Sequence, residues 1–191
     1  IVLSKEHLNI GQMYVINDQV IYQRQYSSFS FLNNLSINVD NIFKNTNFNW
    51  CHLTGITPLL GTSISLLWTN ILYNSIDSKI PISLDLNYRS SLAPFEKLWN
   101  LIKPFLSYLE LFIISISDIN RIAEYEQINI NDISIENKLL IISNKFRIDK
   151  LIMCYKETLK DSSQNRCSYL VHNNKIYKSY IKNHIPIEPI G

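Results

Sequence analysis

The sequence of 191 residues predicts an α/β domain with a mostly parallel sheet. Short apolar runs of strand length alternate with segments whose apolar residues recur at helical spacing, and this alternation is typical of βαβ units. The chain is 46% hydrophobic and 18% charged, so it can form a core and is not disordered by composition. It contains only four glycines, and each is therefore expected to mark a backbone constraint.

The first predicted element is a β-hairpin. The stretches "GQMYVI" and "QVIYQRQ" have strand-like composition and are separated around Asn17 and Asp18, which are common turn residues.

The middle of the chain alternates strands and helices. In chain order we expect a strand in 50–56 that ends at Gly55, a helix in 63–76, a strand in 80–87, a helical segment in 93–109, a strand in 109–115 and a helical piece in 118–126. Pro104 falls inside the helical pattern, so we expect it to kink that helix or to split it in two.

The last part of the chain predicts a strand in 150–159 and a hairpin in 167–181 that turns at Asn173 and Asn174. The segment 184–191 predicts a final strand.

Composition excludes several classes of function. The net charge is +2 and spread along the chain, which gives no electrostatic case for nucleic acid or for an anionic membrane. No apolar run reaches the roughly 18 residues of a membrane span. The three cysteines are odd in number and far apart, so a disulfide framework, a metal site or a redox pair is not expected, and a reducing cytoplasm fits best. The chain starts at Ile1 without a signal-peptide pattern, and we expect it to be a segment of a longer protein.

The stretch "DLNYR" is the first candidate site. On a strand, Asp85, Asn87 and Arg89 would share one face because side chains alternate. Ligands of open parallel sheets bind beyond the carboxyl ends of the strands, and a guanidinium there can bind a carboxylate or a phosphate through two parallel hydrogen bonds. The alternative is a surface Arg89 at the end of a strand, with Asn87 starting a turn.

The predicted hairpin is the second candidate site. Tyr22 and Arg24 share a face by alternation. A two-residue loop would pair Tyr14 with Ile21 and place Tyr14 on the opposite face, whereas a three-residue loop would bring Tyr14, Tyr22 and Arg24 together. The alternative is an ordinary half-buried aromatic hairpin.

Other catalytic signatures are absent from the sequence. The histidines have no metal-ligand spacing, and structural roles are the better interpretation for all four of them. There is no G-x-S-x-G, no C-x-x-C and neither of the common glycine-rich phosphate loops. The residues alone therefore indicate an α/β domain with an anion site and a hairpin.

Four stretches resemble PfkB (ribokinase-like) carbohydrate kinases, and among them the 2-dehydro-3-deoxygluconokinase group. They are "QVIYQRQYSSFS", "WCHLTGITPLLG", "ISLDLNYRSSLAPFEKLW" and "KETLKDSSQNRCSYLVHNNKIY". The resemblance covers nearly the whole chain in order. It implies a ribokinase-like α/β/α sandwich with a small β lid, here incomplete at both ends, with residues 1–30 as the lid segment and residues 31–191 as part of the core.

The resemblance also implies the function. The reaction would be transfer of a phosphoryl group from ATP, with Mg²⁺, to 2-dehydro-3-deoxy-D-gluconate, a small sugar acid. A substrate with a carboxylate accounts for two converging arginines, where a neutral hexose needs fewer positive charges.

The site residues follow from the same resemblance. Tyr14, Tyr22, Arg24 and Arg89 would contact the substrate. The nucleotide side would contain Asn87, Tyr88, Lys160 and Gly191. A homo-oligomer is compatible with this interpretation.

The sequence also departs from the family pattern. The run "IPIEPIG" matches the approach to the family's G-A-G-D loop, so the catalytic Asp is expected beyond Gly191 and the 191 residues alone are expected to be inactive. The family's N-x-x-E motif, which helps to organise Mg²⁺, is replaced by Ser115 to Asp118, which loses the amide but keeps one carboxylate, so the resemblance implies Asp118 as the metal residue. Lys160 stands where an Arg is usual. A degenerate, non-catalytic PfkB-like binding protein and a PfkB kinase for a neutral sugar such as fructose are therefore the alternative hypotheses.

Overall fold

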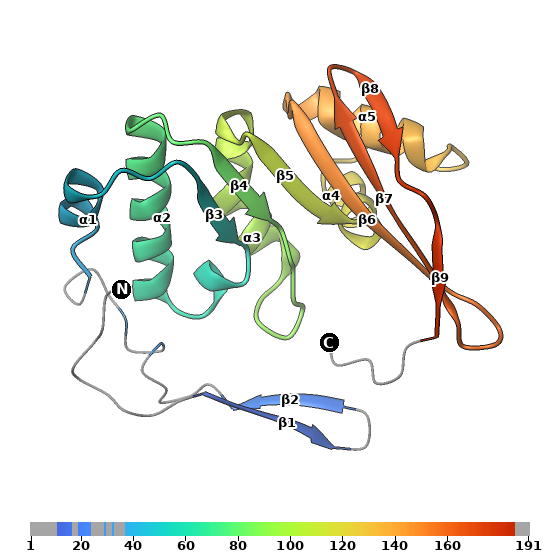
Figure 1. The fold of residues 1–191 in the computed structure, drawn as a ribbon, viewed down its shortest axis with the longest axis horizontal. Helices are drawn as coiled ribbons and strands as arrows, with labels where there is room; N and C mark the ends of the chain where they lie inside the picture. Colours follow the sequence, from blue (N-terminus) through green and yellow to red (C-terminus); the bar gives the residue numbers. More distant parts are fainter. Residues whose placement is uncertain (1–10, 17–18, 24–28, 30–31, 33–36, 186–191) are drawn as a thin grey trace.

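The computed structural model describes residues 11–16, 19–23, 29, 32 and 37–185 (Figure 1). These residues form a two-stranded hairpin and a seven-stranded sheet with helices packed against it. Among the described residues, no helix is long and apolar enough to cross a membrane.

The large sheet has the strand order β3-β4-β5-β6-β7-β8. Strand β9 also pairs with β7, at a different part of β7 from the part that pairs with β8. The strands β3 to β6 are parallel neighbours, and β7 is antiparallel to β6, β8 and β9. The mostly parallel sheet predicted from the sequence is therefore confirmed. The strands are β3 (Cys51–Thr54), β4 (Ile82–Asp85), β5 (Leu111–Ser115), β6 (Lys150–Thr158), β7 (Gln164–His172), β8 (Lys175–Lys178) and β9 (Lys182–His184).

The helices lie in the connections between the parallel strands. They are α1 (Val39–Asn45), η2 (Thr57–Leu59), α2 (Thr62–Asp77), α3 (Phe95–Ile102), η3 (Lys103–Tyr108), α4 (Ile116–Tyr125) and α5 (Ile135–Phe146). Pro104 is the second residue of η3, so the α-helix ends before it and a 3₁₀ helix continues to Tyr108. The prediction that Pro104 interrupts this helix is confirmed.

One face of the sheet contains the hydrophobic core. Alternate strand residues such as Leu84, Phe112 and Met153 are buried in one cluster with the helix residues Trp68 and Trp99. Successive parallel strands joined by right-handed crossovers place their helices on the same face, which matches this cluster. The other strand face is not covered by the described helices, so these helices form one layer of the expected α/β/α sandwich.

Gly55 is required where β3 meets the end of β4. Its amide donates to the Asp85 carbonyl at 2.8 Å. A Cβ atom at this position would lie 2.2 Å from the backbone oxygen of Leu86. Only glycine therefore allows the two strand ends to approach this closely.

Most elements predicted from the sequence are present, with ends shifted by a few residues. The hairpin turn predicted at Asn173 and Asn174 is confirmed, and both residues have positive φ (51° and 57°), as a two-residue type I′ turn requires. The strand predicted in 184–191 overlaps β9 at His184 only, and residues 186–191 lie outside the described residues. Helix α5 was not predicted, although Ser134 caps it and Ile135, Leu139 and Ile142 follow at helical spacing.

The predicted hairpin is also confirmed. Strand β1 (Gln12–Ile16) is antiparallel to β2 (Gln19–Gln23), and Figure 1 shows the pair beyond the carboxyl ends of the parallel strands. The register pairs Ile16 with Gln19, so two residues connect the strands.

Candidate functional site

A cavity of about 340 Å³ lies at the carboxyl ends of β4 and β5, and its volume is in the range of small-molecule sites. Parallel α/β sheets bind their ligands at this edge. The lining combines charged side chains, polar groups and a cysteine: Asp85, Asn87, Tyr88, Arg89, Ser115, Ser117, Asp118, Arg121 and Cys154.

The backbone after β4 turns sharply to bring "DLNYR" around this cavity. The Leu86 amide donates to the Ile113 carbonyl at 2.9 Å, which continues the pairing with β5 by one residue. Asn87 then has φ 40°, and its backbone N–H donates to the Asp85 carboxylate at 3.1 Å. This Asx-type turn ends the strand. Asp85, Asn87 and Arg89 therefore line the same cavity through a turn, and the explanation by strand alternation was wrong.

Asp118 is held by the start of α4. Its carboxylate Oδ2 accepts from the backbone amide and the hydroxyl of Ser115, at 2.9 and 2.7 Å, while the Asp118 amide donates to the Ser115 hydroxyl. This reciprocal capping box fixes Asp118, which is 5% exposed, at the cavity. The other carboxylate oxygen faces Arg121, with Nη1 at 3.3 Å from Oδ1.

Arg121 and Tyr88 close one side of the cavity. The Arg121 guanidinium lies 5.1 Å from the centre of the Tyr88 ring, a cation–π distance. The Tyr88 hydroxyl donates to the Ala93 carbonyl at 2.9 Å, and the ring packs edge-on against Phe95. Tyr88 is therefore a fixed wall whose hydroxyl already has a partner.

Arg89 is the more available of the two guanidinium groups. It is exposed, and no carboxylate of the described residues forms an ion pair with it. Burial raises the pKa of the Asp85 carboxyl above its usual value, the charge of Asp118 adds to this rise, and the Asn87 amide and Arg89 oppose it. The described lining of the cavity thus contains two acids and two arginines, of which Arg89 is the one without an ion pair to a described acid.

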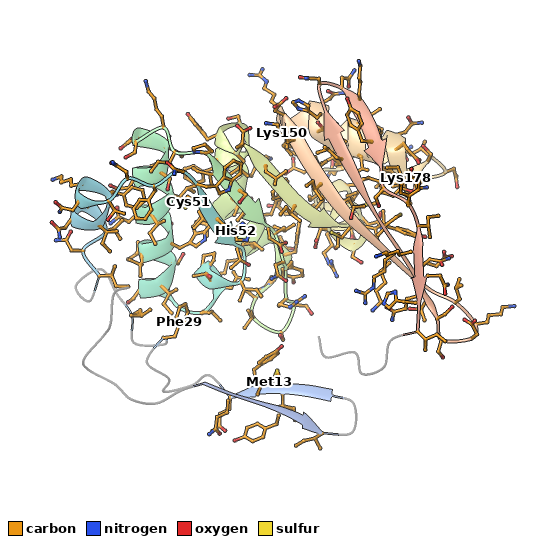
Figure 2. The ribbon with its side chains drawn as sticks, viewed as in Figure 1. Met13, Phe29, Cys51, His52, Lys150 and Lys178 are labelled. Atoms are coloured by element: carbon orange, nitrogen blue, oxygen red, sulfur yellow. The ribbon has the colours of Figure 1, made fainter. Side chains whose placement is uncertain are left out.

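The hairpin register separates two of the residues predicted to bind substrate. Tyr14 pairs with Ile21, and Tyr22 pairs with Met13 (labelled in Figure 2), so Tyr14 and Tyr22 lie on opposite faces of the hairpin. Of the two alternatives that the sequence left open, the two-residue loop is confirmed. The three-residue loop, and with it the grouping of Tyr14 with Tyr22 that the resemblance implied, was wrong. Arg24 lies outside the described residues.

The structure also locates two further predicted residues. Lys160 is exposed in the turn between β6 and β7 and is not among the residues that line the cavity. Gly191 lies outside the described residues. The Nδ1 atom of His52, which is labelled in Figure 2, lies within hydrogen-bond distance of the Ser83 hydroxyl at 2.8 Å.

Arg121, Ser117 and Cys154 were not predicted. Arg121 follows Asp118 by three residues, and this spacing on a helix puts both side chains on one face. Cys154 pairs with Ser115 across β5 and β6, which only the sheet register reveals. All three cysteines are free.

The described residues contain no group of three or more His, Cys, Asp or Glu side chains that could hold a metal ion. A site built on Asp85 or Asp118 would therefore depend on oxygen atoms from a bound ligand and from water.

No protein-family model matches the chain, and no curated protein matches it. Solved structures do match. The chain is similar to 2-dehydro-3-deoxygluconokinase from Thermotoga maritima, with a TM-score of 0.76 and 21% identity over 88% of this chain and 51% of that one. It is also similar to a PfkB family carbohydrate kinase from Listeria grayi, with a TM-score of 0.72 and 20% identity over 88% of this chain and 51% of that one.

A third similar structure is a fructokinase double mutant from Vibrio cholerae, bound to fructose, ADP and potassium, with a TM-score of 0.63 and 16% identity over 93% of this chain and 52% of that one. The chain spans about half the length of these solved structures. At these identities the similarity establishes the fold and not the substrate. The described part of the chain has the ribokinase-like α/β fold of the PfkB carbohydrate kinases.

Proposed function

We propose that the protein is a sugar kinase that transfers a phosphoryl group from ATP to 2-dehydro-3-deoxy-D-gluconate. The observation that carries the proposal is an exposed Arg89, without an ion-pair partner among the described residues, at the carboxyl-end cavity of a fold shared with PfkB carbohydrate kinases.

The choice of a sugar acid depends on charge. Arg121 is engaged by Asp118 and by the Tyr88 ring, whereas no acid in the described part of the chain forms an ion pair with Arg89. A guanidinium can form two parallel hydrogen bonds to a carboxylate, and a neutral sugar offers no such partner. Tyr22 and Arg24 remain proposed substrate contacts, whereas Tyr14 lies on the opposite face of the hairpin.

The cavity also fits ATP and Mg²⁺ by the chemistry of its donors. Proteins bind Mg²⁺ through one or two carboxylates, with water and phosphate oxygens completing the shell. Asp85 and the Oδ1 atom of Asp118 would hold that shell, because Ser115 donates two hydrogen bonds to Oδ2 and Oδ1 has only the longer contact of 3.3 Å with Arg121. The ion would supply positive charge against the phosphoryl oxygens. Asn87, Tyr88 and Lys160 remain the proposed nucleotide contacts.

The second candidate function is a non-catalytic, ligand-binding relative of these kinases. The capping box favours it, because the carboxylate that replaces the family's glutamate is partly committed to the start of α4. A kinase for a neutral sugar is the third, and the similarity to a fructokinase structure supports including fructose in the test.

The test is a coupled ADP-release assay on the native gene product, with 2-dehydro-3-deoxygluconate and fructose side by side. We expect turnover on the sugar acid. Arg89→Gln should raise its KM by about 10-fold to 100-fold, the cost of a charge-assisted hydrogen bond, and leave kcat less affected. Lys97→Gln, which removes an exposed cation on α3, is the matched control and should change neither value.

Each outcome selects one hypothesis. Turnover on fructose alone would contradict the substrate choice. Absence of turnover on both sugars, with Arg89-dependent binding of the acid in calorimetry, would favour the non-catalytic protein.

A further inference from the structure

Arg121 lies between the two elements that form the candidate cavity. Its guanidinium is 5.1 Å from the centre of the Tyr88 ring, in the turn after β4, and its Nη1 atom is 3.3 Å from Oδ1 of Asp118 on α4. A spacing of three residues on a helix is that of a common stabilising ion pair. Because both members of this pair also line the cavity, the pair lies where a ligand would bind.

The two carboxylate oxygens of Asp118 have different partners. Oδ2 accepts two hydrogen bonds from Ser115, at 2.9 and 2.7 Å, as part of the capping box of α4. Oδ1 accepts from Arg121. Asp118 is only 5% exposed, so these contacts decide how its charge is used. Among the described residues, Arg121 is therefore the partner that a divalent cation would displace from Asp118 without disturbing the start of the helix.

The contact between Arg121 and Oδ1 is weak enough to be exchanged. Its length of 3.3 Å exceeds the roughly 2.7–2.9 Å of a charge-assisted hydrogen bond. The Arg121 side chain is 41% exposed, and solvent screens an ion pair at this exposure. A guanidinium has five N–H donors, and this contact uses one of them. A phosphate group, with its greater charge and several oxygens, is a stronger partner than this single oxygen.

Tyr88 supports Arg121 from the other side. The Tyr88 hydroxyl donates to the Ala93 carbonyl at 2.9 Å, and its ring packs edge-on against Phe95, so the ring is held in place. The ring attracts the guanidinium whether its N–H donors meet Asp118 or another anion. Tyr88 is therefore compatible with both arrangements of Arg121.

We propose that Arg121 is a positioning residue that couples the binding of a divalent cation at Asp118 to the binding of a phosphate group in the cavity. Without a ligand, the positive charge of Arg121 at Oδ1 opposes a cation. When the guanidinium turns to a phosphate group, it leaves Oδ1 to the cation. This role of Arg121 rests on the proposed function, because ATP and Mg²⁺ would supply the phosphate and the cation.

The test measures the binding of Mn²⁺ and of inorganic pyrophosphate separately, by calorimetry on the native gene product. Mn²⁺ represents Mg²⁺ because both prefer oxygen ligands, and pyrophosphate is titrated in metal-free buffer. Arg121→Gln should bind Mn²⁺ about 3-fold to 10-fold more tightly than the wild type, since the opposing charge is lost. It should bind pyrophosphate about tenfold more weakly. Arg121→Lys keeps the charge and should restore the Mn²⁺ affinity of the wild type.

The opposite signs of the two changes distinguish coupling from a structural role. Loss of a merely structural ion pair would loosen Asp118 and lower both affinities. In an Asp118→Asn background, Arg121→Gln should leave Mn²⁺ binding unchanged, because Arg121 acts through Asp118. Arg147→Gln is the matched control. Arg147 is an exposed arginine at the C-terminal end of α5, outside this cavity, and its replacement should change neither affinity.

Three results overturn the role of Arg121: changes of the same sign, an unchanged affinity for either ligand in Arg121→Gln, or no binding of Mn²⁺ or pyrophosphate by the wild type. The kinase assay is a separate result. Opposite changes without sugar turnover would place the coupling in a non-catalytic relative. Turnover without these changes would contradict the role of Arg121 alone.

Discussion

At the scale of single residues, the candidate site depends on how the chain leaves β4. Asp85 accepts the Asn87 amide, and the positive φ of Asn87 redirects the backbone so that Tyr88 and Arg89 reach the cavity. The Asp85 carboxylate is partly buried, and this burial is the main reason why its pKa is raised. Repulsion from the Asp118 carboxylate raises the pKa further. The proposed binding role of Asp85 therefore comes at a cost in stability.

Asp85→Asn should stabilise the protein at neutral pH. A raised pKa means that the folded state disfavours the charged form, so the stability of the wild type falls as pH rises above the usual range of an aspartate. The Asp85→Asn substitution removes this charge and keeps a side-chain oxygen that can accept the hydrogen bond from the backbone N–H of Asn87. The melting temperature of the variant should exceed that of the wild type at pH 7, and the gain should shrink as pH falls toward 4. Asp132→Asn, in an exposed turn, controls for a general effect of charge.

Gly55→Ala should destabilise the fold by about 2–3 kcal/mol or more, because the new methyl group meets the Leu86 carbonyl. Since Leu86 precedes the turn that places Arg89, the substitution should also weaken binding at the cavity. Urea denaturation measures the first effect. Gly61→Ala is the control, because nothing lies within 4 Å of a Cβ there. Equal stability of the two variants would contradict the close approach of the strand ends.

At the scale of elements, α4 links stability to the site. Its N-terminal capping box satisfies the orphan amides of the first turn and holds Asp118 at the cavity. Ser115 is both the last residue of β5 and the N-cap of α4, so the strand leads into the helix without a connecting loop.

Ser115→Ala should cost about 1 kcal/mol of stability through the lost cap. It should also change ligand binding at the cavity, since Asp118 loses the hydroxyl that orients it. Ser134→Ala removes the corresponding cap of α5, where the Ser134 hydroxyl accepts the Asn137 amide at 3.2 Å. We expect a similar loss of stability there but no effect on binding. Chemical denaturation and calorimetry on both variants separate the two roles, and an unchanged affinity in Ser115→Ala would disprove the link.

At the scale of the whole molecule, the described helices cover one face of the sheet, and β3 is an edge strand among the strands that the structure describes. Large apolar side chains near this edge are exposed, among them Phe48 and Trp50 at 37% and 48%. Exposed apolar surface beside an unpaired strand favours association.

The isolated 191-residue chain should therefore self-associate at roughly 10 µM and melt over a broad range. Sedimentation velocity should show a larger monomer fraction for Phe48→Gln/Trp50→Gln than for the wild type. Tyr180→Gln, a fully exposed position far along the chain from β3, should leave association unchanged. A sharp cooperative melt of a monomeric wild type would be evidence against this prediction.

The sequence by itself determined the alternation of elements. Periodicity identifies βαβ units, and local chemistry located the break at Pro104 and the turn at Asn173 and Asn174, because these signals act over a few residues. It also drew attention to Arg89, which lines the cavity. Helix α5 was missed because its isoleucines and asparagines are weak helix formers in isolation and its stability comes from packing on the sheet.

Only the tertiary structure decided which residues share a site. The hairpin register separated Tyr14 from Tyr22, a turn and not a strand brought Asp85 and Arg89 together, and Arg121 and Cys154 joined them from other elements. The physical reason is that pairing between distant strands is fixed by burial across the whole sheet, and a shift of one residue moves every side chain to the other face.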